Sequence, residues 1–444
     1  MAKKGRSRPH VPWRDYPWTV QTLTIIGALA LGGVLLALFF SIGKGPRHVV
    51  ATATPPVDSR DFLLAVSGTA GVPIREGGRA RLLNNGREFF PALLGAIRNA
   101  RKSVNFTCYI WEDGRVSDDI LEALLDRARA GVEVRVLLDG FGGMRAPEEG
   151  MEALRAAGGK VEIFRAPRLG KFTRFHKRNH RRAIVIDGAV GFTGGIAVGD
   201  KWLGDADSED HWRDSMVEVT GPLAATLQSA FIDLWAGSVG ELLVGPEFFP
   251  PPGPAPSPGG EPITLHVGIA SSPYYESRPL RFFFIQSFLA ARKRLWITTP
   301  YFVPDRATRQ AAADRARAGV DVRILLPDHH TDADVVRLAS RAYYQELLEA
   351  GVRIYEYNRT MIHAKHVVVD GQWSVVGSPN MDVRGSELNE ENVLGILDLE
   401  FGRQLEETFR RDLASADEIH LEAWRKRWWE RPVNWAATLF AQQY

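Results

Sequence analysis

Short runs of β-branched and other apolar residues alternate with longer amphipathic stretches along most of this chain of 444 residues. Runs such as Val134–Leu138, Ala183–Ile186 and His366–Val369 predict buried strands, and the stretches between them predict helices. Strands and helices that alternate along a chain build a sheet with helices on both faces. We therefore expect an α/β fold.

The pattern occurs twice, because residues 126–138 (DRARAGVEVRVLL) and 314–326 (DRARAGVDVRILL) match almost residue for residue. A solenoid repeat is only about 20–50 residues long, so these copies indicate a duplicated domain. We expect a first domain at 76–244 and a second at 262–415. Residues 43–75 are expected to form a tether, and the stretch 245–261, rich in proline and glycine, a semi-rigid linker.

The N-terminus favours a membrane anchor, since residues 17–43 carry no charge. About 20 apolar residues cross a bilayer, and we expect a transmembrane helix over 19–42. A cleaved signal peptide is the alternative, although its apolar core is usually about 7–15 residues. Basic residues in 1–18 outnumber those just after the segment, which predicts a cytoplasmic N-terminus and a catalytic part on the outer face.

The C-terminal segment 416–444 mixes tryptophan with arginine and lysine, notably in the stretch WRKRWWERP. Two interpretations stay open. One is a terminal helix packed on the second domain. The other is a membrane-surface segment, because tryptophan and cationic side chains suit anionic headgroups.

Charge and cysteine usage limit the partners. The chain has 55 basic and 53 acidic residues, a formal net charge of +2, which is too balanced for bulk nucleic-acid binding through counterion release. We expect no nucleic-acid partner. Cys108 is the only cysteine, so an intramolecular disulfide and a cysteine metal cluster are both excluded.

Two matched sets of reactive side chains carry the candidate chemistry. Each set has a histidine, a cation two residues later, an aspartate five residues after the cation, and then a glycine. The sets are His180, Arg182 and Asp187, and His363, Lys365 and Asp370. A turn of small residues follows each set, at 193–195 and at 377–380. The duplication suggests one active site built from two halves and acting on one phosphodiester.

Imidazole is a competent nucleophile without deprotonation from a high pKa, so attack on phosphorus would give a phosphohistidine. A second, protonated histidine would donate to the departing alkoxide and then act as base on the incoming alcohol or water. The cation two residues along a strand shares its histidine's face and can clamp phosphoryl oxygens. We expect no metal and no cofactor.

The His-x-Lys-x4-Asp pattern in two copies, with Gly-Ser-x-Asn after the second, resembles the phospholipase D superfamily, and more narrowly the bacterial cardiolipin synthases. The stretches 299–305, 351–357 and 386–389 support the resemblance. It implies two tandem phospholipase D-like α/β/α domains with a pseudo-two-fold relation. It also implies that His180 is the nucleophile and His363 the general acid and base, and the reverse assignment stays open.

The remaining roles follow from this resemblance. The cations would bind phosphate together with Ser378 and Asn380. Each histidine needs a carboxylate on its other nitrogen, and we expect Glu391 to serve His363 and Asp214 to serve His180. The motif aspartates, Asp187 and Asp370, are expected to brace the motif rather than react.

Two positions depart from the family pattern. Arg182 stands where the family usually has lysine, and Ala197 where it usually has asparagine. His176 and His366 fall outside the motif register, and we expect them to be surface or packing residues.

The leading hypothesis is a single-pass protein of the bacterial inner membrane that makes cardiolipin and glycerol from two phosphatidylglycerol molecules. A phospholipase D that releases phosphatidic acid, a nucleic-acid phosphodiesterase and a non-catalytic lipid-binding protein are the alternatives. The donor and acceptor lipids stay open.

Overall fold

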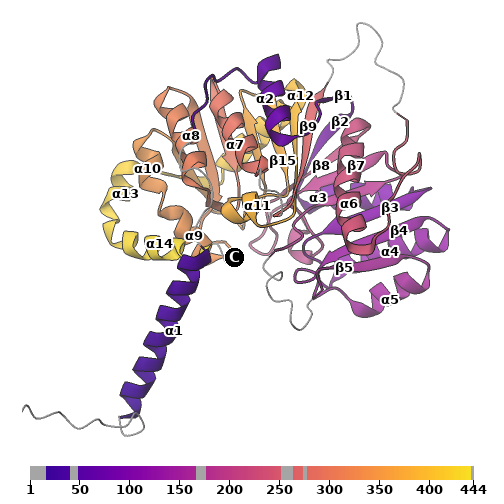
Figure 1. The fold of residues 1–444 in the computed structure, drawn as a ribbon, viewed down its shortest axis with the longest axis horizontal. Helices are drawn as coiled ribbons and strands as arrows, with labels where there is room; N and C mark the ends of the chain where they lie inside the picture. The colour runs from indigo at the N-terminus through magenta and orange to yellow at the C-terminus, as the bar shows by residue number, and fades with distance from the viewer. Residues whose placement is uncertain (1–16, 41–48, 167–176, 252–263, 274–277, 442–444) are drawn as a thin grey trace, which may run out of the picture.

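The computed structural model describes residues 17–40, 49–166, 177–251, 264–273 and 278–441. Two mixed sheets lie next to each other, each flanked by helices (Figure 1). The first sheet has the strand order β2-β8-β7-β6-β3-β4-β5. Its strands are β2 (Arg79–Asn84), β3 (Ser103–Cys108), β4 (Glu133–Asp139), β5 (Lys160–Phe164), β6 (Ala183–Ile186), β7 (Val190–Gly194) and β8 (Ser215–Thr220).

The second sheet has the order β1-β9-β17-β15-β14-β10-β12-β13-β18. Its strands are β1 (Arg75–Glu76), β9 (Leu265–Ser271), β10 (Arg294–Thr298), β12 (Asp321–Pro327), β13 (Arg353–Tyr357), β14 (His366–Val369), β15 (Trp373–Gly377), β17 (Glu391–Leu397) and β18 (Ala416–Ile419). A separate parallel pair joins β11 (Phe302–Val303) to β16 (Met381–Asp382).

Without its edge strands β1 and β18, the second sheet repeats the topology of the first. In each sheet three strands run parallel, β3-β4-β5 and β10-β12-β13, and the others pair antiparallel. The three strands predicted from apolar runs coincide with β14 and β6 and lie within β4. The predicted α/β fold with a two-domain repeat is therefore confirmed.

Helices cover both sheets. The first sheet is accompanied by α3 (Asn85–Arg98), α4 (Arg115–Arg129), α5 (Glu148–Ala156) and α6 (Pro222–Val239). The second is accompanied by α7 (Pro279–Ala290), α8 (Arg306–Arg317), α9 (Asp334–Arg341), α10 (Tyr344–Glu349), α11 (Val383–Glu387) and α12 (Leu399–Leu413). The C-terminal segment forms α13 (Leu421–Lys426), the 3-10 turn η4 (Trp428–Glu430) and α14 (Arg431–Thr438).

A shared core joins the halves. Helix α6 packs on β6 and β7 of its own sheet and also on β9, while α12 packs on β14 and β15 and also on β2. The buried cluster between them contains Phe231 and Trp235 from α6 together with Trp296 and Phe409 from the second half. Because each helix bridges both sheets, the two halves hold one fixed relation at their interface.

The segments expected as tether and linker are partly folded. Within 43–75, α2 (Arg60–Ala70) packs on α7, and Phe62 meets the ring of Trp373 edge-on at 5.1 Å. At the start of the linker, Phe248 is buried and Arg135 lies over its ring. Residues 252–263, most of the predicted linker, lie outside the described residues.

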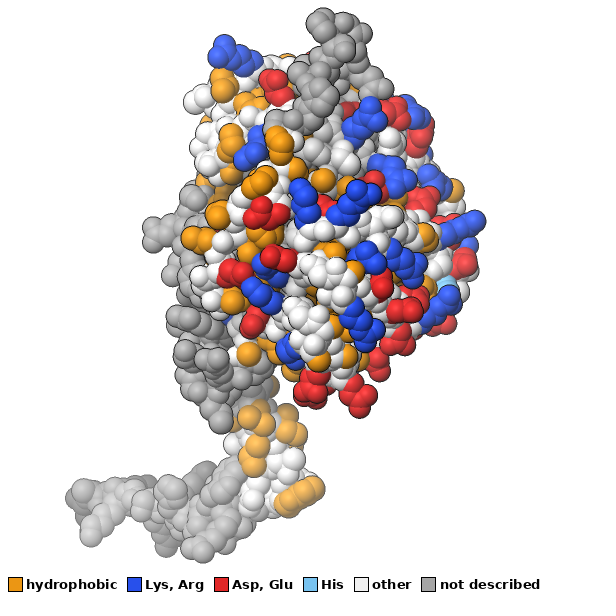
Figure 2. All heavy atoms as spheres, turned by 90° about the vertical axis from the view of Figure 1, so that its right-hand side faces the viewer, with side chains coloured by type: hydrophobic (Ala, Val, Ile, Leu, Met, Phe, Trp, Pro, Cys, Tyr) orange, Lys and Arg blue, Asp and Glu red, His pale blue; other side chains and the backbone are white. Residues whose placement is uncertain are grey.

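Helix α1 (Trp18–Phe40) extends away from the body of the molecule, leaving it at the end where α9 and α14 lie (Figure 1). Across the described part of the chain, no helix reaches the length and apolar character that a membrane crossing requires, so the structure does not support the transmembrane helix expected over 19–42. On the face shown in Figure 2, basic and acidic side chains are interspersed, as the balanced charge of the chain predicts.

Candidate active site

The two halves meet along the segments that carry the motif histidines. Asn179 bridges Glu390 in parallel, and Arg213 bridges Ile362 in the same way. These contacts form within the four residues that precede β6, β17, β8 and β14, so the segments leading into four strands of two sheets converge there. The register places residue 180 opposite 391 and residue 214 opposite 363.

Each histidine takes its carboxylate from the other half. His180 Nδ1 lies 2.9 Å from Glu391 Oε1, and His363 Nδ1 lies 2.7 Å from Asp214 Oδ2. The expected pairing, Glu391 with His363 and Asp214 with His180, is therefore wrong. The cause is the parallel register of the bridges, which brings the strand start of one sheet beside the histidine of the other.

Burial controls the charge of both imidazoles. Desolvation lowers the pKa of His180 to about 4, and the Glu391 carboxylate opposes that shift. Desolvation and the neighbouring Lys365 ammonium lower the pKa of His363 to about 4, against the pull of Asp214. Both rings are therefore neutral near pH 7, with Nδ1–H donating to the carboxylate. The Nε2 lone pair of His180 is left for bonding to a substrate, whereas His363 Nε2 lies 3.0 Å from Lys365 Nζ, which can donate to it.

The motif cations lie beside their histidines. Arg182 is fully buried, and its Nη1 donates to the His180 carbonyl oxygen at 2.9 Å. Its Nε and Nη2 atoms have no hydrogen-bond partner among the described residues. Lys365 Nζ donates to the His363 carbonyl oxygen at 2.7 Å, and burial lowers its pKa to about 7. Unpaired buried donors are costly, so an anionic oxygen between these cations would be strongly held.

The small-residue turn after the second motif has two different functions. The Ser378 hydroxyl donates to Glu391 and accepts from the Asn392 backbone N–H at 3.0 Å, so it orients the carboxylate instead of pointing freely at a ligand. Asn380 is buried, and its Oδ1 has no hydrogen-bond partner among the described residues. Of the two turn residues, Asn380 is therefore the one with a side-chain atom left to bond a substrate.

The motif aspartates lie at the far ends of β6 and β14 from the histidines. Asp187 accepts the backbone N–H groups of residues 101, 102 and 103, and Asp370 accepts those of residues 292, 293 and 294. Both have positive φ, 53° and 54°, in tight turns before a glycine. The same contacts in both halves hold β3 and β10 in place, so these carboxylates brace the sheets and do not reach the reacting atoms.

A shell of side chains that was not predicted from the sequence surrounds the two pairs. Trp202 Nε1 donates to Asp214 at 3.0 Å, and Asn389 Nδ2 donates to Glu391 at 3.2 Å. Tyr109 packs edge-on to His180 with ring centroids 5.0 Å apart.

Two further histidines, His176 and His366, lie outside the His-x-Lys-x4-Asp motifs. His366 is buried with neither ring nitrogen bonded to a described residue, and burial lowers its pKa to about 3, as expected for a packing residue. His176 lies outside the described residues. Ala197, the second departure from the family pattern, is buried in the core of the first half.

One grouping of possible metal ligands occurs among the described residues, and it contains none of the motif residues. It comprises Asp328, His329 and His330, next to the end of β12. Both ring Nδ1 atoms already bond the Asp328 carboxylate, at 2.7 and 2.8 Å. We interpret this grouping as a turn whose polar side chains bond one another. Among the described residues, no second grouping of this kind includes the motif histidines.

Two halves of equal topology that share paired histidines and buried cations define a phospholipase D-like enzyme. The family described as "Cardiolipin synthase, PLD-like domain" matches residues 93–235 and 284–413. Cardiolipin synthase A of Pseudomonas fluorescens is 37% identical over 368 residues, which are 82% of this chain and 74% of that protein. A cardiolipin synthase of Halalkalibacterium halodurans is 35% identical over 362 residues, 81% and 71% of the two chains.

The chain belongs to the cardiolipin synthase family of phosphatidyltransferases. Among solved structures, a phosphatidylserine synthase of Haemophilus influenzae superposes with a TM-score of 0.66 at 16% identity, over 86% of this chain and 100% of that one. At this identity the likeness concerns the fold alone.

Proposed function

We propose that the enzyme joins two phosphatidylglycerol molecules into cardiolipin through a phosphohistidine. His180 Nε2 attacks the phosphorus of the first lipid, and the bond to the glycerol oxygen breaks. His363, protonated when the anionic substrate is bound, gives its proton to that oxygen, and glycerol leaves. His363 then accepts the proton of a hydroxyl of the second lipid, whose oxygen attacks phosphorus and frees His180.

The observation that carries this proposal is the crossed pairing of histidines and carboxylates. A carboxylate on Nδ1 fixes the tautomer that leaves Nε2 free to attack, and it stabilises the imidazolium when a proton arrives. Both rings have this support, as a mechanism with one nucleophile and one acid and base requires. The buried guanidinium of Arg182 and the ammonium of Lys365 stabilise the negative charge that develops on the phosphoryl oxygens in the transition state.

Burial of the site favours transfer over hydrolysis. His180 and His363 are both buried, and a site that excludes water lets a lipid hydroxyl compete for the intermediate. A site held at a bilayer would also meet both lipids at high effective concentration. We propose phosphatidylglycerol as donor and as acceptor because its phosphoester-linked glycerol is the leaving group in the first step and a free hydroxyl of the second molecule's glycerol attacks in the second step.

We further propose that the N-terminal segment 19–42 anchors the enzyme in the inner membrane of a bacterial cell, with residues 1–18 in the cytoplasm and the catalytic halves on the outer face. Its support is the uncharged helix α1 and the exposed apolar side chains along it, including Leu23, Ile26 and Leu29. Protease added to intact spheroplasts should remove the catalytic halves, and full protection would contradict the proposed orientation.

The decisive experiment for the reaction is product analysis by mass spectrometry. Purified enzyme in mixed micelles receives phosphatidylglycerol without added metal, beside His180→Ala and His363→Ala variants. Cardiolipin and glycerol that are absent with both variants support the proposal. Phosphatidic acid as the sole lipid product would make the enzyme a hydrolase, and turnover in either variant would contradict the two-histidine mechanism.

A further inference from the structure

The end of the chain presents an unusual group of exposed aromatic side chains. Trp428, Trp429 and Trp435 are 66%, 59% and 64% exposed, and Val433 and Phe440 beside them are also exposed. We call these five residues the C-terminal aromatic surface. Large apolar side chains that are exposed together along one short segment indicate an interaction site, because their contact with water is unfavourable.

The segment is firmly held by its opposite face, so the exposure does not come from loose packing. Trp424 of α13 is buried against Tyr344, with ring centroids 5.1 Å apart, and Arg341 lies over it at 4.9 Å. Helix α14 packs on α9 through Asn434 and Ala437. The packed terminal helix expected from the sequence is therefore found, and the membrane-surface interpretation concerns the opposite, exposed face.

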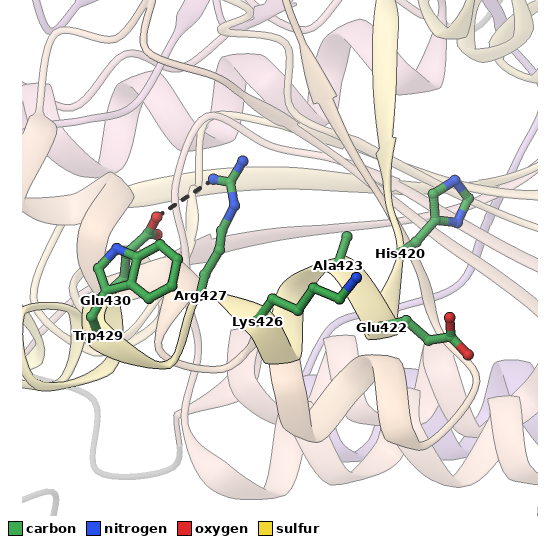
Figure 3. A pocket seen from close by; sticks show the side chains of 7 residues that line it. All are labelled: His420, Glu422, Ala423, Lys426, Arg427, Trp429 and Glu430. Atoms are coloured by element: carbon green, nitrogen blue, oxygen red, sulfur yellow. Dashed lines mark ion pairs between the residues drawn. The ribbon is translucent and has the colours of Figure 1, made fainter.

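Positive charge lies among these aromatic side chains. Residues 421–438 contain four basic and two acidic side chains. Beside Trp429 is an open hollow of about 800 Å³ formed by α13 and η4 (Figure 3). Arg427 pairs with Glu430 at 3.5 Å in its lining, whereas Lys426 forms no ion pair with the described residues and faces the hollow. Tryptophan beside lysine and arginine is the composition that favours the headgroup region of an anionic bilayer.

The position of the surface agrees with this partner. Helix α1 leaves the body at the same end of the molecule as α9 and α14, whereas α2 and α12 lie at the opposite end (Figure 1). A bilayer that contacts the C-terminal aromatic surface is thus on the side toward which α1 extends.

We propose that the C-terminal aromatic surface docks the catalytic halves onto a bilayer that contains anionic phospholipids, with the tryptophan rings in the headgroup region and Lys426 bound to a lipid phosphate. This inference concerns binding and stands whichever reaction the site catalyses. It assigns the segment a positioning role, because docking fixes the height and tilt of the site over its lipid.

A depth measurement on the full chain tests the proposal. Burial raises the pKa of the Cys108 thiol to about 12, so an introduced cysteine reacts alone with a fluorescent label. The label is placed at Val433→Cys, which keeps every tryptophan, and at Trp435→Cys. The matched control is Leu399→Cys, which is 64% exposed at the start of α12. Vesicles of phosphatidylcholine with brominated acyl chains, with or without phosphatidylserine, quench a label that enters the bilayer.

We expect quenching at positions 433 and 435 when phosphatidylserine is present, a weaker effect without it or at raised salt, and none at position 399. Since α1 would hold every variant on the vesicle, flotation confirms attachment in each sample. Unquenched labels at 433 and 435 on floated protein would overturn the proposal and leave a protein partner for this surface. Equal quenching at 399 would overturn it too.

A second readout uses turnover. The double variant Trp429→Ser and Trp435→Ser should lose activity several-fold on vesicles and keep it in detergent micelles, where no planar surface needs to be contacted. Equal loss in both media would indicate damage to the fold and contradict a docking role.

Discussion

Replacement of Asp214 by asparagine tests whether a carboxylate of one half orients the histidine of the other. Asp214 is fully buried, with Oδ2 accepting from His363 Nδ1 at 2.7 Å and from Trp202 Nε1 at 3.0 Å. Its other oxygen, Oδ1, accepts from the Ser215 backbone N–H at 2.7 Å. An amide has a single oxygen, so in Asp214→Asn one of these N–H groups must face an NH2 group.

The magnitude follows from these contacts. A hydrogen bond to a charged group contributes about 1.5–3 kcal/mol, and each 1.36 kcal/mol in a barrier is a factor of ten in rate. Loss of the bond therefore lowers kcat by roughly 10- to 150-fold. An NH2 group that faces His363 would also force the proton onto Nε2, the wrong tautomer, which costs up to about 10⁴-fold in a serine protease triad. We expect a fall in kcat between about 10² and 10⁴.

The assay is initial-rate formation of glycerol from phosphatidylglycerol in mixed micelles, with thermal unfolding of each variant measured in parallel. The chain offers a matched control, because Asp207 forms the same kind of pair with His211, at 2.9 Å, but on the exposed surface. Asp207→Asn should leave kcat unchanged. A folded Asp214→Asn enzyme with a rate within a few-fold of the parent would refute the assignment of that carboxylate to His363.

Three other substitutions probe the cations, the braces and the buried imidazoles. Arg182→Lys should stay within about tenfold of the parent rate, since Lys365 makes the equivalent contact with a carbonyl oxygen in the other half, whereas Arg182→Met should lose at least 10²-fold in initial rates. Asp187→Asn should lower the Tm measured by circular dichroism by several degrees and leave kcat per folded molecule nearly unchanged, because its carboxylate accepts only backbone N–H groups. Burial lowers the pKa of His366 to about 3, so as pH falls the unfolded chain takes up this proton before the folded protein does, and stability decreases between about pH 6.5 and 3. In His366→Phe, urea titrations across this range should show a weaker dependence of stability on pH. An unchanged profile would contradict the prediction.

Local pattern predicts much of this molecule. Apolar runs place β4, β6 and β14, and the near-identical stretches at 126–138 and 314–326 reveal the duplication. The motif spacing also puts each cation on its histidine's face, as found for Arg182 and Lys365. The strands and the motif geometry depend on neighbours within a few residues of one another, where the periods of strand and helix apply, and the duplication is visible because the two copies keep nearly the same residues.

The pairing of the carboxylates could not be predicted in this way. Asp214 follows His180 by a few strands, so proximity in sequence favoured that pair. The true partner depends on the bridges of 179 with 390 and of 213 with 362, which form only when two sheets dock. The role of Ser378 could not be predicted for the same reason. Its hydroxyl donates to Glu391, and the position of that carboxylate depends on the docking of the two sheets.

The crossed pairs give a physical reason for keeping both copies in one chain. Taken alone, either half has a histidine without its carboxylate and a carboxylate without its histidine, and both would be buried polar groups with lost partners. The contacts that complete the two pairs are those that close the interface, where α6 packs on β9 and α12 on β2. Assembly of the site and association of the halves are thus one event. The linker keeps the local concentration of the second half high enough for that event to occur within a single chain.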